Sequence, residues 1–221
     1  MRKIPFLIFF TATLLSLSAI SLNSNSIEIK PAVIKKVYPP FNLDNLKVTS
    51  YFSYLEMNEK WYWKIPERYR DFAAKNSYEA GQLPLWALYV MIEWESGWQP
   101  KAHHNNIDPV TGEIWSVDRG IGQICNAYQK GYVHDFYKGD PKKFDVWNWR
   151  DNLQTSIYHL ANLRKTFDGN WYKAFEAYNG GIIMILKNTV KPEVKKYAIR
   201  LLKMANKTEY IPIEQKKKIK K

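Results

Sequence analysis

The chain has 221 residues, and 33 Lys and Arg against 21 Asp and Glu give it a formal net charge of +12. Hydrophobic residues make up 46% of the chain, which is enough to fill a core and excludes a protein that is disordered throughout. The only cysteine is Cys125, which excludes an internal disulfide bond and a metal site built from several cysteines.

The first 22 residues have the pattern of a secretory signal peptide. A basic start, Met1-Arg2-Lys3, precedes an apolar run from Ile4 to Leu15. Small residues follow the run, at Ser16, Ser18, Ala19 and Ser21. The short run favours cleavage, and an uncleaved membrane anchor or a buried helix is the alternative. We therefore expect an exported protein of the periplasm or cell envelope, which disfavours nucleic acid as the partner of the basic chain.

Three further segments follow the predicted signal. Residues 23–65 are expected to form a linker or N-terminal segment, because residues 23–50 are rich in Asn, Ser, Lys and Pro and lack periodicity. A folded domain is expected over residues 66–205. Residues 206–221 form a basic tail, which is typical of a solubilising end; contact with a membrane surface is the alternative.

Helical signals dominate the predicted domain. Pro66 suits a first helical turn and Gly81 suits a helix end, which predicts a helix between them. Apolar residues at helical spacing predict further helices at 84–96, within 122–137, and at 149–167, 171–178 and 182–187. Pro192 opens the last helix, whose apolar stripe contains Val194, Tyr197, Ala198, Leu201 and Leu202.

One segment has turn and strand chemistry instead. Residues 108–113 read Asp-Pro-Val-Thr-Gly-Glu, and Ile114, Trp115 and Val117 fit a short strand after this turn. The sequence therefore predicts a mostly α domain with one small β-hairpin or flap.

Two carboxylates, Glu93 and Glu95, stand at the end of the otherwise apolar helix predicted at 84–96. A carboxyl group in apolar surroundings is costly to ionise, so its pKa rises, and a general acid needs such a pKa. Helical spacing does not choose between the two residues, because both fall on apolar faces. Solvation of one or both at the helix end is the alternative.

Three short segments together resemble the lytic transglycosylase domain. They are Glu95-Ser96, Gly120-Ile121-Gly122-Gln123 and Ala177-Tyr178-Asn179-Gly180-Gly181. The family has a Glu-Ser pair, a Gly-Leu-Met-Gln segment and an Ala-Tyr-Asn-x-Gly segment in the same order. The likeness spans about residues 66–205. It implies a mostly α, lysozyme-like (α+β) fold with a small β-hairpin or flap insertion.

The resemblance implies roles for individual residues. Glu95 is expected to be the catalytic acid/base, with Glu93 a structural residue. Ser116 and Gln123 fall where the family contacts the N-acetyl groups and backbone of the sugar, and the Gln123 amide offers both a donor and an acceptor. The alternative is that Gln123 caps a helix.

Tyr178 and Asn179 fall where the family lines the cleft beside the catalytic Glu. We expect the Tyr178 hydroxyl to hydrogen-bond the Glu95 carboxyl and its ring to keep the site dry. The alternative is that Tyr178 belongs to the core.

The chain departs from the family pattern at two places. Ile121-Gly122 replaces the usual Leu-Met, which puts the sugar contact of that segment in doubt. The segment from His103 to Trp115 is an insertion between two motifs, and we expect it to form a flap over the glycan.

The reaction that the resemblance implies is cleavage of the β-1,4 bond between N-acetylmuramic acid and N-acetylglucosamine, giving 1,6-anhydromuramic acid ends. It requires no metal or cofactor. The expected partner is the peptidoglycan glycan strand, with a wall-crossing protein assembly as a further candidate. A hydrolytic lysozyme and a noncatalytic wall-binding protein are the alternatives. A hydrolase needs a positioned water, and Asp118 is the only acidic residue well placed in the motif region to hold one.

Two remaining groups have weaker signals. His103 and His104 with Asp108 could be imagined as a metal site, but adjacent histidines in a polar turn are typical of a surface. Cys125 lies in an apolar context and is expected to pack rather than to act as a nucleophile.

Overall fold

The computed structural model describes residues 50–207. Its helices are α1 Tyr51–Met57, α2 Glu59–Tyr62, α3 Glu67–Glu79, α4 Leu85–Ser96, α5 Gln129–Phe136, α6 Trp149–Thr166, α7 Trp171–Gly180, α8 Ile182–Leu186 and α9 Pro192–Lys207. Strands β1 His103–Ile107, β2 Ile114–Arg119 and β3 Ile124–Cys125 form an antiparallel sheet in the order β1-β2-β3. The predicted class, a mostly α lysozyme-like (α+β) domain with a small β-hairpin, is confirmed.

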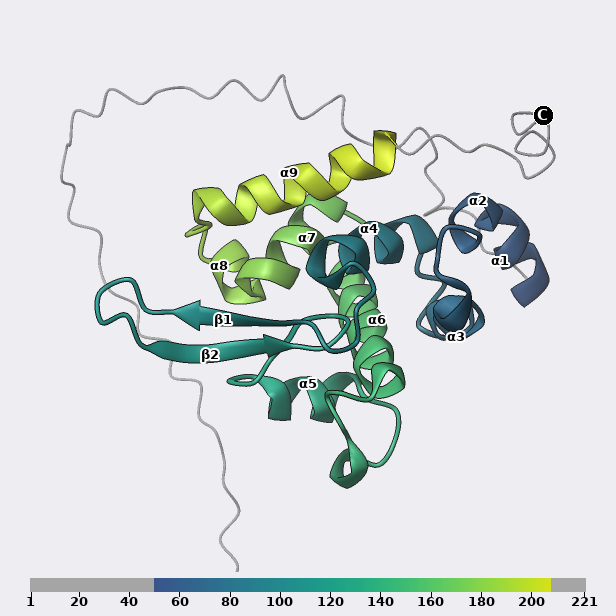
Figure 1. The fold of residues 1–221 in the computed structure, drawn as a ribbon. Helices are drawn as coiled ribbons and strands as arrows, with labels where there is room; N and C mark the ends of the chain where they lie inside the picture. The colour runs from purple at the N-terminus through teal and green to yellow at the C-terminus, as the bar shows by residue number, and fades with distance from the viewer. Residues whose placement is uncertain (1–49, 208–221) are drawn as a thin grey trace, which may run out of the picture.

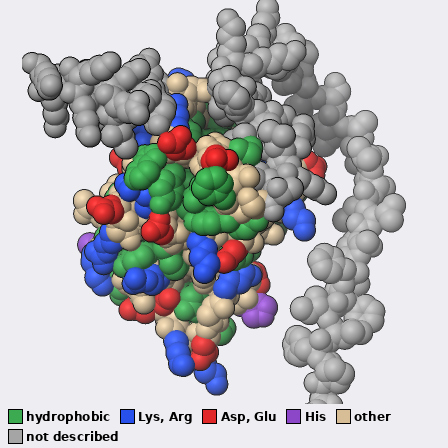
Figure 2. Space-filling model, turned by 90° about the vertical axis from the view of Figure 1, so that its right-hand side faces the viewer, with side chains coloured by type: hydrophobic (Ala, Val, Ile, Leu, Met, Phe, Trp, Pro, Cys, Tyr) green, Lys and Arg blue, Asp and Glu red, His purple; other side chains and the backbone are tan. Residues whose placement is uncertain are grey.

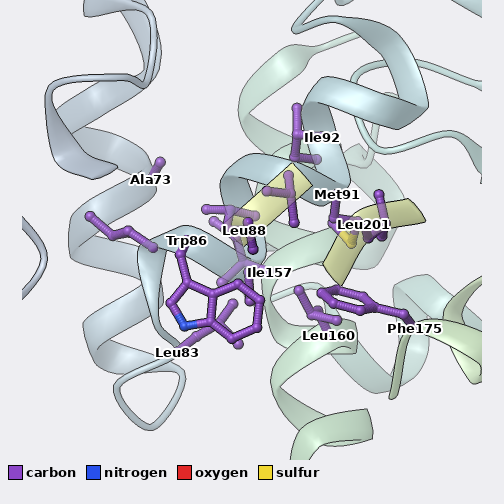
Figure 3. Close-up of a cluster of buried hydrophobic side chains, with 14 of the residues drawn as sticks. Ala73, Leu83, Trp86, Leu88, Met91, Ile92, Ile157, Leu160, Phe175 and Leu201 are labelled. Atoms are coloured by element: carbon purple, nitrogen blue, oxygen red, sulfur yellow. The ribbon is translucent and has the colours of Figure 1, made fainter. Parts of the chain in front are cut away.

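Helix α4 runs through the middle of the core. It is apolar on nearly every side, and such a helix is stable only when other elements surround it. Figure 3 shows Leu88, Met91 and Ile92 of α4 among side chains from α6, α7 and α9. These neighbours fix the helix from several directions, so the position of its C-terminal turn is fixed as well.

The predicted helix boundaries of α3 and α4 are confirmed. Pro66 is the N-cap residue of α3, and Gly81, just beyond its end, has a φ of 91°. Helix α4 ends at Gly97, whose φ of 57° lies in the left-handed region that favours glycine. The predicted helices at 149–167, 171–178 and 182–187 correspond to α6, α7 and α8.

The helix predicted within 122–137 is confirmed as α5, which occupies the second half of that range. Helix α5 begins at Gln129, and the residues before it form turns and the two-residue strand β3. Gln123 has a φ of 52°, which a right-handed helix cannot contain. A strand this short leaves no periodicity to detect.

The packed unit also includes residues before 66. Helices α1 and α2 fall in the segment that the sequence analysis assigned to the N-terminal region. The buried Tyr54 donates its hydroxyl hydrogen to the Leu83 carbonyl at 2.6 Å, and the Leu85 N–H donates to Asn58 at 2.9 Å. These helices therefore secure the loop that leads into α4. The predicted signal at 1–22, most of the 23–65 segment and most of the basic tail lie outside the described residues.

The surface on the side of α1 to α3 is mixed in character. Figure 2 shows hydrophobic side chains there among interspersed Lys, Arg, Asp and Glu. Among residues 50–207, no helix is long and apolar enough to cross a membrane.

Candidate active site

Glu95 and Glu93 have different environments on the last turn of α4. Glu93 is exposed, whereas Glu95 is partly buried and points toward α9. Burial raises the pKa of Glu95 to about 7, the hydrogen bond from Tyr197 opposes this rise, and the negative charge of Asp118 adds to it. Glu95 can therefore hold a proton near neutral pH and donate it to a base or to an atom that gains negative charge during a reaction.

Tyr197 of α9 is the group that touches the Glu95 carboxyl. Its hydroxyl donates to Glu95 Oε1 at 2.5 Å, and its side chain is buried. Burial raises the pKa of Tyr197 well above its ordinary range, so it stays a hydrogen-bond donor. The sequence analysis placed Tyr197 only in an apolar stripe, and its contact with Glu95 was missed.

Tyr178 of α7 does not make the predicted bond to Glu95. Its hydroxyl donates instead to the Gly122 carbonyl at 2.8 Å. The charge of Glu95 nevertheless contributes, after burial, to the raised pKa of Tyr178. Tyr178 therefore lies near Glu95 but supports the neighbouring loop. Asn179, the next residue, is exposed, and its side chain forms no hydrogen bond with the described residues.

Ser96 connects α4 to the Gly120–Gln123 segment. Its hydroxyl donates to the Ile121 carbonyl at 2.6 Å. Asn152 of α6 connects the same segment to the rest of the domain: its Oδ1 accepts from the Gly122 N–H at 2.8 Å, and its Nδ2 donates to the Arg119 carbonyl at 2.9 Å. The segment next to Glu95 is thus held from α4, α6 and α7.

Gly122 explains the departure from the usual Leu-Met pair. A Cβ atom at this position would lie 1.9 Å from Ser156 Oγ, far inside van der Waals contact. Ser156 is itself buried in α6. Only glycine allows the segment to lie this close to α6, so no side chain at position 122 contacts a sugar.

The side-chain amide nitrogen of Gln123 is hydrogen-bonded to the backbone. Its Nε2 donates to the Gly120 carbonyl at 2.8 Å and to the Ala102 carbonyl at 3.1 Å. The residue adopts a φ of 52°, a strained conformation of the kind that concentrates at functional sites. Its Oε1 accepts no hydrogen bond from residues 50–207. The carbonyl oxygen of the Gln123 side chain is therefore available to accept a hydrogen bond from a ligand.

Ser116 lies in the central strand β2 and is only 2% exposed. Asn106 of β1 donates from Nδ2 to Ser116 Oγ at 2.9 Å and to Asp118 Oδ2 at 3.0 Å. Ser116 is therefore part of a polar network along one face of the hairpin strands, and Asn106, which the sequence analysis did not single out, organises that network.

The hairpin of β1 and β2 confirms the predicted insertion. Its outer part has large exposed apolar side chains at Ile107, Val110, Ile114 and Trp115. Trp94, next to Glu95 on α4, is also exposed, and the guanidinium of Arg200 lies 4.4 Å from its ring centroid. Figure 1 shows the hairpin projecting below α8 and α9.

The two histidines of the insertion, His103 and His104, are both exposed. Within the part of the chain that the structure describes, no three His, Cys, Asp or Glu side chains come together in a group that could hold a metal ion. Cys125 is half-buried in β3 and forms no disulfide.

Comparison with known families agrees with this geometry. The family model described as Transglycosylase SLT domain matches residues 72–200, more than half of the chain, and covers α4, the hairpin and α7. No curated protein and no solved structure matches the chain. The matched region contains the partly buried Glu95, the Gly120–Gln123 segment and the Tyr178-Asn179 pair, and the chain belongs to the transglycosylase SLT domain family of peptidoglycan lytic transglycosylases.

Proposed function

We propose that Glu95 is the single catalytic acid/base of this lytic transglycosylase and that Tyr197 orients it. The observation that carries the proposal is the Glu95 carboxyl at the end of an apolar helix, bonded by a buried tyrosine hydroxyl and with a pKa raised by burial to about 7. Glu93 on the same turn is exposed and lacks these surroundings.

In the proposed first step, protonated Glu95 gives its proton to the glycosidic oxygen as the bond from that oxygen to C1 of N-acetylmuramic acid breaks. The acetamido carbonyl of the substrate stabilises the positive charge that develops at C1. The released N-acetylglucosamine keeps the proton as a hydroxyl group.

In the second step, ionised Glu95 takes the proton from the C6 hydroxyl of the same N-acetylmuramic acid. The C6 oxygen closes on C1, which gives the 1,6-anhydro product and returns Glu95 to its protonated form. The cycle consumes no water, and the residues of this chain supply all of its proton transfers.

Four residues are proposed to form the glycan-binding site around Glu95, two by contacting the strand and two by holding the neighbouring backbone. The Gln123 Oε1 is oriented by the two backbone bonds of its Nε2, which suits an acetamido N–H donor. Exposed Asn179 can contact the strand directly. Tyr178 contributes by holding the Gly122 carbonyl, and Ser116 by accepting the Asn106 bond that links the two strands of the hairpin.

The location of the protein is part of the proposal. The sequence pattern of residues 1–22 supports export to the periplasm or cell envelope, where the substrate of the family lies. The proposed domain boundaries remain a signal at 1–22, an N-terminal segment to 65, the catalytic domain at 66–205 and a basic tail. Membrane-surface contact through that tail and a wall-crossing assembly as partner belong to the same proposal.

The test compares Glu95→Gln with the matched variant Glu93→Gln. Each is incubated with purified sacculi, and the released muropeptides are identified by mass. Glu95→Gln should lose glycan cleavage, because the amide is nearly isosteric but cannot transfer a proton. Glu93→Gln should release 1,6-anhydro products at close to the wild-type rate.

Thermal melting of both variants shows whether the fold is intact. An active Glu95→Gln together with an inactive, folded Glu93→Gln would assign the chemistry to the other carboxylate. Products that end in reducing N-acetylmuramic acid would mean that water, and not the C6 hydroxyl, attacks C1.

A further inference from the structure

Helix α9 has a row of basic residues on its outward side. Lys196, Arg200 and Lys203 are spaced at i, i+4 and i+7, so they lie on one face of the helix, and all three are exposed. The inward side of α9 has the buried Tyr197 and Leu201. The helix is therefore held in the domain by one face, and the other presents the three cations, named here the basic stripe.

Among residues 50–207, no acidic side chain forms an ion pair with the basic stripe. The one acidic residue of α9 is Glu193, which lies in the first turn. Beyond α9 the sequence adds five lysines within its last six residues. Positive charge therefore prevails along the sequence from Lys196 to the C-terminal end.

Exposed apolar groups lie beside the basic stripe. Ile199 is exposed and stands three residues after Lys196 and four before Lys203, so it is a neighbour of both on the helix surface. The guanidinium of Arg200 lies 4.4 Å from the ring centroid of Trp94, which is exposed as well. Basic residues next to a tryptophan and an aliphatic side chain are typical of surfaces that meet lipid headgroups, since the cations attract phosphate and the indole ring lies at headgroup level.

The basic stripe and the catalytic carboxyl lie on different sides of α9. Tyr197, on the inward side, bonds Glu95. Figure 1 shows α8 between α9 and the hairpin, which projects away from α9. A glycan strand bound between Glu95 and the hairpin therefore leaves the basic stripe uncovered.

The charge of the basic stripe decides what can cover it. A second copy of the chain is a poor occupant, because a two-fold contact through this face would place the three cations against the same three cations. A layer of anionic lipid has the complementary charge, and its negative potential attracts basic side chains within about 10 Å.

We propose that the basic stripe of α9 docks the enzyme on an anionic phospholipid surface, with the hairpin and Glu95 turned away from the lipid and toward the cell wall. The inference rests on the proposed location in the cell envelope and is independent of the role of Glu95. Lipid phosphates accept hydrogen bonds from Lys196, Arg200 and Lys203, and Trp94 and Ile199 lie at the level of the headgroups.

The first test maps the accessibility of lysines in the full chain on lipid vesicles. The vesicles contain phosphatidylglycerol with phosphatidylcholine, or phosphatidylcholine alone, and acetylation of each lysine is followed by mass spectrometry. Acetylation of Lys196 and Lys203 should slow severalfold on the anionic vesicles only, and should recover in high salt, which screens the attraction. The internal controls are the exposed Lys130 of α5 and Lys142 shortly after it, because Figure 1 places α5 on the opposite side of the domain from α9. Both should react at one rate throughout.

Three results of this test would overturn the proposal. The first is equal acetylation of the stripe lysines and the control lysines on anionic vesicles. The second is slowing by purified sacculi but not by anionic vesicles, which would assign the basic stripe to an anionic wall polymer. The third is slowing that depends on protein concentration without lipid, which would assign it to a second copy.

The second test is the triple variant Lys196→Gln, Arg200→Gln and Lys203→Gln of the full chain. Each basic residue near an anionic surface strengthens binding about fivefold, so the ratio of affinities for anionic and neutral vesicles should fall about a hundredfold. The matched control substitutes glutamine for Lys130, Lys142 and Lys143, which are exposed on the α5 side, and it should change the ratio little. An unchanged ratio in a triple variant that melts like the wild type contradicts the proposal.

Cleavage of soluble glycan fragments separates the inference from the proposed function. The triple variant should cleave them at the wild-type rate, and Glu95→Gln should keep the lipid-dependent acetylation pattern. A folded triple variant that loses this cleavage would place the basic stripe in substrate binding and contradict the docking. If Glu95→Gln is active and the acetylation pattern is as expected, only the assignment of the acid fails.

Discussion

The two sides of the site differ in secondary structure and in how firmly the rest of the domain holds them. On one side, Glu95 lies at the end of a helix whose residues up to Ile92 are almost all buried, and Tyr197 reaches it from the buried face of α9. On the other side, the hairpin is held by its strand pairing and by Asn106, which bonds Ser116 and Asp118, and its outer residues are exposed. The helical side therefore fixes the acid, and the hairpin offers surface to a long polymer.

This difference indicates how the two sides should respond to mutation. Close packing on the helical side transmits a small change in volume to the whole domain. The hairpin tip is exposed and has hydrogen bonds only within its own turn, so a change there has little effect on the rest of the domain. Changes on the helical side are expected to affect stability and the chemical step, whereas changes at the hairpin tip are expected to affect the binding of glycan.

The largest effect is expected from Gly122→Ala, which tests the close packing directly. The new Cβ would lie 1.9 Å from Ser156 Oγ, so the segment must move away from α6. We expect a loss of about 2–3 kcal/mol in the free energy of unfolding, together with loss of activity. The control is Gly131→Ala in α5, where a Cβ meets nothing within 4 Å and helix propensity should stabilise the fold. Equal melting temperatures for the two variants would show that the Gly120–Gln123 segment can shift to accommodate the added methyl group without loss of stability.

Tyr197→Phe should have an intermediate effect that is confined to chemistry. The change removes the hydrogen bond to Glu95 Oε1 and leaves the ring in place. We expect kcat to fall about tenfold, since the acid loses its orientation. The hydrogen bond lowers the pKa of Glu95, so its removal should move the alkaline limb of the activity profile to higher pH.

The matched hydroxyl deletion is Tyr62→Phe, which loses a surface bond to Asp71 far from this chemistry. It should leave the pH profile as it is. An unchanged profile in Tyr197→Phe as well would mean that the bond to Glu95 has no part in tuning the acid.

The smallest effect on stability is expected from shortening the hairpin tip. Replacing residues 108–113 with Asn-Gly keeps the paired Ile107 and Ile114 and closes the strands with a two-residue turn. The replaced bonds join tip residues to one another, such as Gly112 N–H to the Asp108 carbonyl. The melting temperature should change by about 2 °C or less, while cleavage of long glycan strands weakens a few-fold.

The replacement must not extend to Asn106, because this residue holds both Ser116 and Asp118. Short glycan fragments are the control substrate and should be cleaved at the wild-type rate. A large loss of stability with undiminished turnover would show that the tip is a structural brace.

The sequence predicted the parts of the site that depend on local pattern. The Glu95 helix ends at Ser96, as predicted, and the turn chemistry of residues 108–113 lies between the two strands of a hairpin. The choice between Glu93 and Glu95 could not come from helical spacing, because both faces of α4 are apolar. The choice depends on which elements cover the last turn of α4. Tyr197 of α9, which covers Glu95, is 102 residues away from it along the chain.

The residues that sequence reasoning missed are those with distant partners. Tyr197 fits an apolar stripe, and only its contact distinguishes it from a core tyrosine. Asn152 stands in the buried part of α6, and it binds groups 30 and 33 residues earlier in the chain. A buried asparagine on an apolar helix face is the one signal that could have drawn attention to this position, because a buried amide must find partners.

The burial that keeps Glu95 protonated also makes folding stability depend on pH. The folded protein holds this proton up to about pH 7, whereas an ordinary glutamate releases it near 4.5. The contribution of Glu95 to stability is therefore fully present below about pH 4.5 and is lost as pH rises through about 7. The native state is thus weakened under the alkaline conditions that also remove the catalytic proton, so activity and stability decrease together as pH rises.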